Sequence, residues 1–171
     1  MKTPLAGLLL CALAVQADAR PSSTLIEACL RTETMPPSVL YTSLAANAFE
    51  VMEDEDAGKI HITLQHGRDK VGIWEVKNSQ EFGLIFNGKE MPLALIERLD
   101  HGEPPAVFNP YEAIWGKAHE GRESYICTTF NFGGLGKSGT FQNRRGLYLI
   151  ERRPHPGAIF YTTGKVVLEE N

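Results

Sequence analysis

Short runs of strand-forming, mostly apolar residues separated by polar turn residues dominate the chain from Phe49 on. Residues 60–65, Ile-His-Ile-Thr-Leu-Gln, show the period of two that is typical of a half-buried strand. Other runs that predict strands occupy residues 71–76, 81–86, 91–99, 125–132, 146–152, 158–161 and 165–168. Short strands at this spacing predict an all-β domain, built as an antiparallel sandwich or barrel of about eight strands.

Turn residues separate these runs. Asn87-Gly88 stands between 81–86 and 91–99 and is a strong signal for a two-residue hairpin. The acidic stretch Glu53–Gly58 predicts another hairpin tip, and Thr163-Gly164 predicts the last hairpin turn.

The N-terminal part of this domain is expected to be helical. Residues 24–33 predict a short helix, in which Thr24 and Glu27 form a capping box. Residues 38–49 are ambiguous, because 38–44 fit a strand whereas 44–46 favour a helix, and residues 111–115 predict one helical turn.

The first 19 residues have the pattern of a secretory signal peptide. A single lysine, Lys2, precedes an apolar run from Leu5 to Val15, and Ala17-Asp18-Ala19 fits the cleavage site. We therefore expect a signal peptide at 1–19, one β-rich domain at 20–171, and a periplasmic or secreted location. No later segment is long and apolar enough to predict a membrane span.

Two cysteines remain after the predicted cleavage, Cys29 and Cys127. Exported proteins meet an oxidising compartment, in which two thiols commonly pair. The sequence therefore predicts a disulfide between them, with two buried free thiols as the alternative.

The composition excludes several classes. The chain has 171 residues and a formal net charge of −4, which argues against a general nucleic-acid binder.

The segment 133–138 lacks the first glycine of a phosphate-binding loop, and residues 53–64 lack the ligand spacing of a calcium loop. The five histidines are not spaced as zinc ligands, and no Gly-x-Ser-x-Gly motif is present. We expect no cofactor, no metal and no catalytic residues.

Basic residues gather near a glycine-rich connection at 131–145. Residues 20–110 carry 8 basic and 14 acidic side chains, whereas 137–165 carry six basic and one acidic. Arginine and aromatic residues commonly anchor interfaces, and long loops in compact domains are often functional. The candidate partner-binding residues are Phe132, Leu135, Lys137, Ser138, Phe141, Arg144 and Arg145. The alternative is a structural loop whose arginines lie in solvent beside an edge strand.

These observations favour an exported binding protein that neutralises another protein through the basic loop. A hydrolase inhibitor or a toxin-immunity protein fits this description, and the partner would be an enzyme with an acidic active site. Two alternatives remain: a hydrolase of a cell-envelope glycan or lipid, and a barrel that binds a small apolar ligand.

Overall fold

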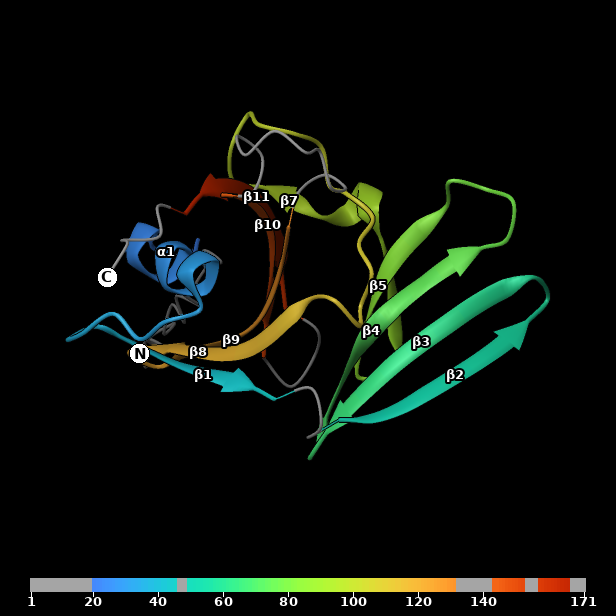
Figure 1. The fold of residues 1–171 in the computed structure, drawn as a ribbon, viewed down its shortest axis with the longest axis horizontal. Helices are drawn as coiled ribbons and strands as arrows, with labels where there is room; N and C mark the ends of the chain where they lie inside the picture. Colours follow the sequence, from blue (N-terminus) through green and yellow to red (C-terminus); the bar gives the residue numbers. More distant parts are fainter. Residues whose placement is uncertain (1–19, 46–48, 132–142, 153–156, 167–171) are drawn as a thin grey trace, which may run out of the picture.

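Two β-sheets pack face to face as a sandwich in the computed structural model, and they do not close into a barrel (Figure 1). The structure describes residues 20–45, 49–131, 143–152 and 157–166, so the predicted signal peptide lies outside the described residues. The elements are α1 (Ser23–Arg31), β1 (Val39–Leu44), β2 (Glu50–Asp56), β3 (Lys59–His66), β4 (Asp69–Val76), β5 (Phe82–Phe86), β6 (Lys89–Pro92), the 3₁₀ turn η2 (Leu93–Leu95), β7 (Glu97–Arg98), β8 (Ile114–Glu120), β9 (Glu123–Asn131), β10 (Arg144–Glu151) and β11 (Ile159–Lys165).

The sheets differ in topology. One has six strands in the order β1-β8-β9-β10-β11-β7, and the other is a meander of five strands in the order β2-β3-β4-β5-β6. Neighbouring strands are antiparallel, apart from the short parallel pairing of β11 with β7. The predicted all-β antiparallel fold is confirmed as a sandwich.

The six-stranded sheet has a hydrophobic cluster on each face. Large side chains of its inner face, such as Trp115 and Tyr148, pack toward the five-stranded sheet together with Phe108 from the segment before β8. Its outer face is covered by α1, which contributes Leu25 and Leu30. Among the described residues, no helix is long and apolar enough to cross a bilayer.

Helix α1 begins one residue earlier than the sequence predicts. The Ser22 side chain accepts a hydrogen bond from the backbone N–H of Leu25 at 3.0 Å, so Ser22 is the N-cap and Thr24 lies inside the first turn. The helix ends at Arg31, and the C-cap residue Thr32 adopts the left-handed conformation typical of that position.

The hairpin predictions have mixed outcomes. Asn87 and Gly88 have φ of 50° and 80°, and they connect β5 to β6 as predicted. The acidic residues 53–56 belong to strand β2, and the turn itself is Ala57-Gly58. The prediction of a turn at Thr163-Gly164 is wrong, because both residues lie within β11 and pair with residues of β10.

Strand β8 replaces the end of the helical turn predicted at 111–115. The strand begins at Ile114, and sequence alternation is weak because Gly116 and Ala118 stand at two of its positions. Gly116 is required by close packing: a Cβ at this position would lie 2.2 Å from the hydroxyl oxygen of Tyr41. The glycine that weakens the alternation in the sequence is therefore the residue that makes room for the Tyr41 ring.

The predicted disulfide is consistent with the structure. The sulfur atoms of Cys29 in α1 and Cys127 in β9 lie at bonding distance, and the Cα atoms are 5.8 Å apart. The link joins the helix to the centre of the six-stranded sheet.

Candidate functional site

The predicted basic loop is only partly within the described residues. Five of its seven candidate side chains lie outside them: Phe132, Leu135, Lys137, Ser138 and Phe141. The other two, Arg144 and Arg145, are the first residues of β10 rather than the end of a loop.

Both arginines are half-buried and have partners within the chain. The guanidinium of Arg144 lies 3.4 Å from a carboxylate oxygen of Glu103. Arg145 donates a hydrogen bond of 2.6 Å to the backbone carbonyl of Leu30, near the C-terminus of α1. Arginine at this place satisfies a helix carbonyl that has no partner in the helix, so Arg145 has a structural contact of its own.

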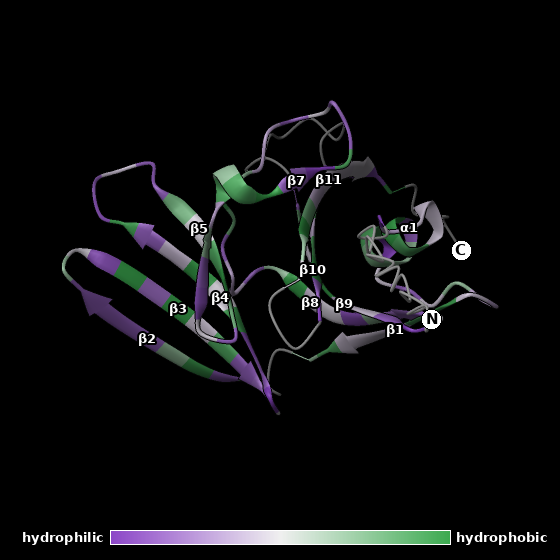
Figure 2. Cartoon of the chain, turned by 180° about the vertical axis from the view of Figure 1, so that it is seen from behind, coloured by the Kyte–Doolittle hydropathy of each residue, from purple (hydrophilic) through white to green (hydrophobic). Residues whose placement is uncertain are grey.

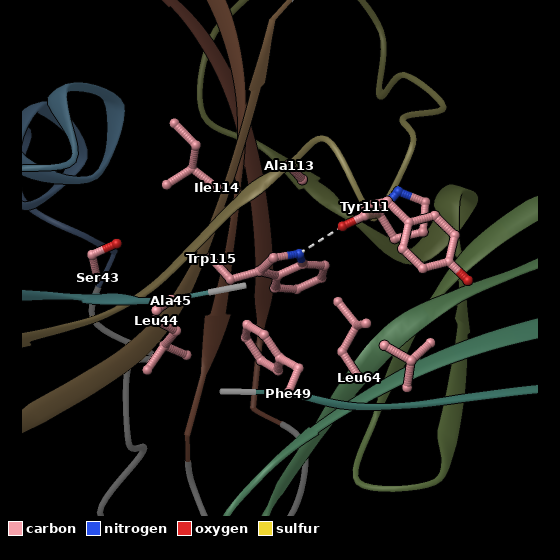
Figure 3. Close-up of a pocket in the computed structure, with 11 residues that line it drawn as sticks. Ser43, Leu44, Ala45, Phe49, Leu64, Tyr111, Ala113, Ile114 and Trp115 are labelled. Carbon is pink, nitrogen blue, oxygen red and sulfur yellow. Dashed lines mark hydrogen bonds between the residues drawn. The ribbon is translucent and has the colours of Figure 1, made fainter. Parts of the chain in front are cut away.

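An apolar cleft opens between the two sheets, and sequence reasoning did not find it (Figure 3). Its volume is about 270 Å³. The residues that line it come from both sheets and from the segment before β8: Ser43, Leu44, Ala45, Phe49, Val51, Leu64, Pro110, Tyr111, Ala113, Ile114 and Trp115.

Two aromatic side chains in contact, Trp115 and Phe49, form one wall of the cleft. Trp115 is buried, and its indole N–H donates to the Pro110 carbonyl at 3.0 Å, which orients the ring (Figure 3). Phe49 packs edge-on against Trp115, with ring centroids 6.5 Å apart. The indole nitrogen is satisfied by the backbone, so this wall presents an apolar surface.

The rim of the cleft is exposed to solvent although it is apolar. Val51, Tyr111 and Ile114 are 45%, 49% and 38% exposed. Apolar side chains gathered at one opening form a continuous surface, which is typical of an interaction site rather than of an enclosed cavity. The Tyr111 hydroxyl also hydrogen-bonds the Glu53 carboxylate, which joins the rim to strand β2.

An ion cluster beside the cleft connects the two sheets. The Asp69 carboxylate at the start of β4 lies 2.9 Å from Lys117 Nζ in β8 and 2.9 Å from an Nη atom of Arg152, which follows β10. Burial by itself would raise the pKa of Asp69, but hydrogen bonds and charges from Lys117 and Arg152 outweigh it and lower the pKa. The carboxylate is therefore ionised at neutral pH, as a link between the sheets requires.

The two histidines of β3 point to opposite faces of the sheet, as their spacing predicts. His61 lies between Asp54 and Glu90, at 2.9 and 2.7 Å, on the face away from the cleft. His66 packs edge-on against Phe49 on the cleft side. Within the described residues, no group of three histidine, cysteine or acidic side chains is arranged to hold a metal ion.

No protein-family model, curated protein or solved structure matches this chain.

Proposed function

We propose that this chain is a binding protein whose intersheet cleft holds an apolar side chain of a protein partner. The observation that carries this proposal is the open cleft itself, with an ordered Trp115 wall and an exposed apolar rim. Partner residues that fill such pockets commonly contribute most of the binding free energy of an interface.

The exposed apolar rim of the cleft favours a partner side chain over a small ligand. Sites for small molecules usually have about 300–1,000 Å³ and bury most of the ligand surface. This cleft has about 270 Å³, close to the lower end of that range, and three of its apolar lining side chains, Val51, Tyr111 and Ile114, are more than a third exposed. A partner that covers the rim while one side chain fills the cleft would bury both.

The proposal retains the neutralisation of another protein as the class of function and adds a second contact surface. The loop predicted at 131–145 stays a candidate, although two of its residues, Arg144 and Arg145, each have a partner within the chain. A disulfide is compatible with the predicted export. Strands of both sheets contribute lining residues to the cleft, and sites built on strands are positioned more precisely than sites built on loops.

The cleft can be tested with toluene, which has the shape of a phenylalanine side chain. We expect toluene to shift the methyl NMR signals of Leu44, Val51, Leu64 and Ile114 in a saturable way, with millimolar affinity. Ile114→Arg should weaken this binding at least tenfold, because a guanidinium at the rim fills and polarises the opening. Ile114 is partly exposed, so the fold should tolerate the change.

Leu95→Arg is the matched control, because Leu95 is 71% exposed and is not among the residues that line the cleft. It should leave toluene binding unchanged. Toluene shifts that are absent, or that are equal in Ile114→Arg and the parent, would contradict the proposal. Micromolar binding of octanoate at the same methyl groups would instead identify a small amphiphile as the natural occupant.

A further inference from the structure

Strand β2 is the exposed edge of the five-stranded sheet. All seven of its residues are exposed, and β3 is the only described strand that pairs with it (Figure 1). An edge of this kind presents a row of backbone N–H and C=O groups that another extended chain can use.

The side chains of β2 divide the strand into two halves. Val51 and Met52 are apolar, whereas the four residues from Glu53 to Asp56 are all acidic. Figure 2 shows β2 as hydrophilic over most of its length, beside the alternating bands of β3. A chain paired with β2 would therefore meet two apolar side chains, which follow Glu50 near one end, and a run of four carboxylates at the other end.

The apolar half of β2 is part of the cleft. Val51 lines the cleft, and Glu53, on the same face two residues later, bonds to Tyr111 at the rim. A residue that pairs with Val51 would have its side chain on this face, about 5 Å from that of Val51, at the opening. The open edge and the cleft therefore form one continuous surface.

The negative charge of β2 is only partly neutralised by its surroundings. Asp54 contacts His61, and Glu55 contacts Lys77, but both carboxylates remain 79% and 49% exposed. The backbone of Asp56 pairs with Lys59 in β3, but its carboxylate forms no hydrogen bond or ion pair with the side chains of the described residues. β2 itself contains five acidic residues and no basic one.

We propose that β2 accepts an extended basic segment of the protein partner as an added strand. The segment has two apolar residues opposite Val51 and Met52, followed by basic residues opposite Glu53–Asp56. The apolar residue opposite Val51 inserts into the cleft, and in this respect the inference rests on the function proposed above. Basic side chains pair with carboxylates across the strands, and the backbone hydrogen bonds extend the sheet.

The same charges disfavour a second copy of this chain as the occupant. Two β2 strands side by side would place carboxylates opposite carboxylates, which is repulsive. Acidic side chains on an edge thus prevent self-association while they still admit a chain of opposite charge.

Two capped heptapeptides test the inference, Gly-Leu-Val-Lys-Arg-Lys-Arg and its reverse, which cover the parallel and antiparallel directions. We expect one of them to bind, to slow hydrogen exchange of β2 amides, and to shift the methyl signals of Val51. Replacing its basic residues by glutamine should weaken binding at least tenfold at low salt, and high salt should remove most of this difference. N-methylation of alternate peptide bonds should abolish binding, because backbone donors are lost.

Asp54→Asn with Asp56→Asn should weaken the basic peptide about tenfold. Glu33→Gln with Glu81→Gln removes the same charge from exposed positions outside β2 and should change affinity less than twofold. Equal loss in both double variants, binding that survives N-methylation, or failure of both peptides to bind would overturn the inference.

The outcomes separate this inference from the proposed function. If toluene occupies the cleft but neither peptide protects β2, the added strand is wrong and the cleft proposal stands. If a peptide with glycine in place of leucine binds equally well and toluene does not bind, the cleft proposal is wrong.

Discussion

Replacing Asp69 by asparagine should destabilise the protein, because this carboxylate is the ionic link between the two sheets. Its side chain is only 10% exposed and lies 2.9 Å from the cationic groups of both Lys117 and Arg152. Asparagine has nearly the same shape but no charge, so the change leaves two cations facing a neutral amide.

The magnitude follows from the burial of the three groups. A hydrogen bond to a charged group contributes about 1.5–3 kcal/mol, and removing one partner of a buried ion pair costs about 3–5 kcal/mol. Lys117 and Arg152 are 20% and 28% exposed, so water partly solvates them after the change. We expect Asp69→Asn to lower the free energy of unfolding by about 2–4 kcal/mol at pH 7.

The loss should depend on pH. The pKa of Asp69 is lower in the folded protein than its usual value of about 3.9, so ionisation stabilises the fold above that value. As the pH falls through the folded pKa, the carboxylate is protonated in both states and this stabilisation disappears. The difference between parent and Asp69→Asn should therefore be constant from pH 7 to about 5 and shrink below about pH 4.

Urea unfolding followed by tryptophan fluorescence at pH 7 and pH 3.5 measures both effects. Glu55→Gln is the control, because the Glu55–Lys77 pair is about half exposed, and exposed pairs contribute about 0–1 kcal/mol. The reasoning is refuted if Asp69→Asn changes stability at pH 7 no more than Glu55→Gln does, or if its effect is the same at both pH values.

Three further changes test other parts of the fold by thermal melting. Replacing Cys29 and Cys127 together by serine should cost about 2–5 kcal/mol, because a link across 98 residues restricts the unfolded chain; an unchanged melting temperature would show that no stabilising bridge forms. Gly83→Ala should cost about 1–3 kcal/mol, because its Cβ would lie 2.5 Å from the Met91 carbonyl; a neutral result would show that β6 can move aside. Arg145→Ala should cost about 1–2 kcal/mol, because the arginine bonds the C-terminal end of α1; no loss of stability would leave it free for a partner.

The fold class could be predicted because its signals are local. The alternation at 60–65 identifies β3, and Asn87-Gly88 identifies the β5–β6 turn, since left-handed conformations at both positions need those residues. Strand β8 has no clear alternation in the sequence, because Gly116 stands where the ring of Tyr41 packs. Tyr41 is distant in sequence, so the pattern around Gly116 does not show this requirement. The acidic residues of β2 predict a turn, because charged residues are rare in strands. The structure has them in a strand because an exposed edge tolerates charged side chains.

The candidate site could be predicted much less well than the fold. The charge pattern identifies Arg144 and Arg145 as candidates, but it does not show which group in the folded chain each side chain contacts. Arg145 bonds Leu30, which is 115 positions away. The aromatic side chains that follow the proline-containing segment 104–110 were the available signal for the cleft, since they include Tyr111 and Trp115.

The cleft also depends on how the two sheets are held together, which no single segment determines. Lys117 contacts Asp69 and lies 3.5 Å from His66, whose ring packs against Phe49 in the cleft wall. A series of contacts between the two sheets thus connects the ion cluster to the aromatic wall of the cleft. A chain that keeps its strands but loses this link would retain the two sheets while changing the distance between the cleft walls. The Asp69 carboxylate at the start of β4 therefore links stability to the geometry of the cleft that we propose as the binding site.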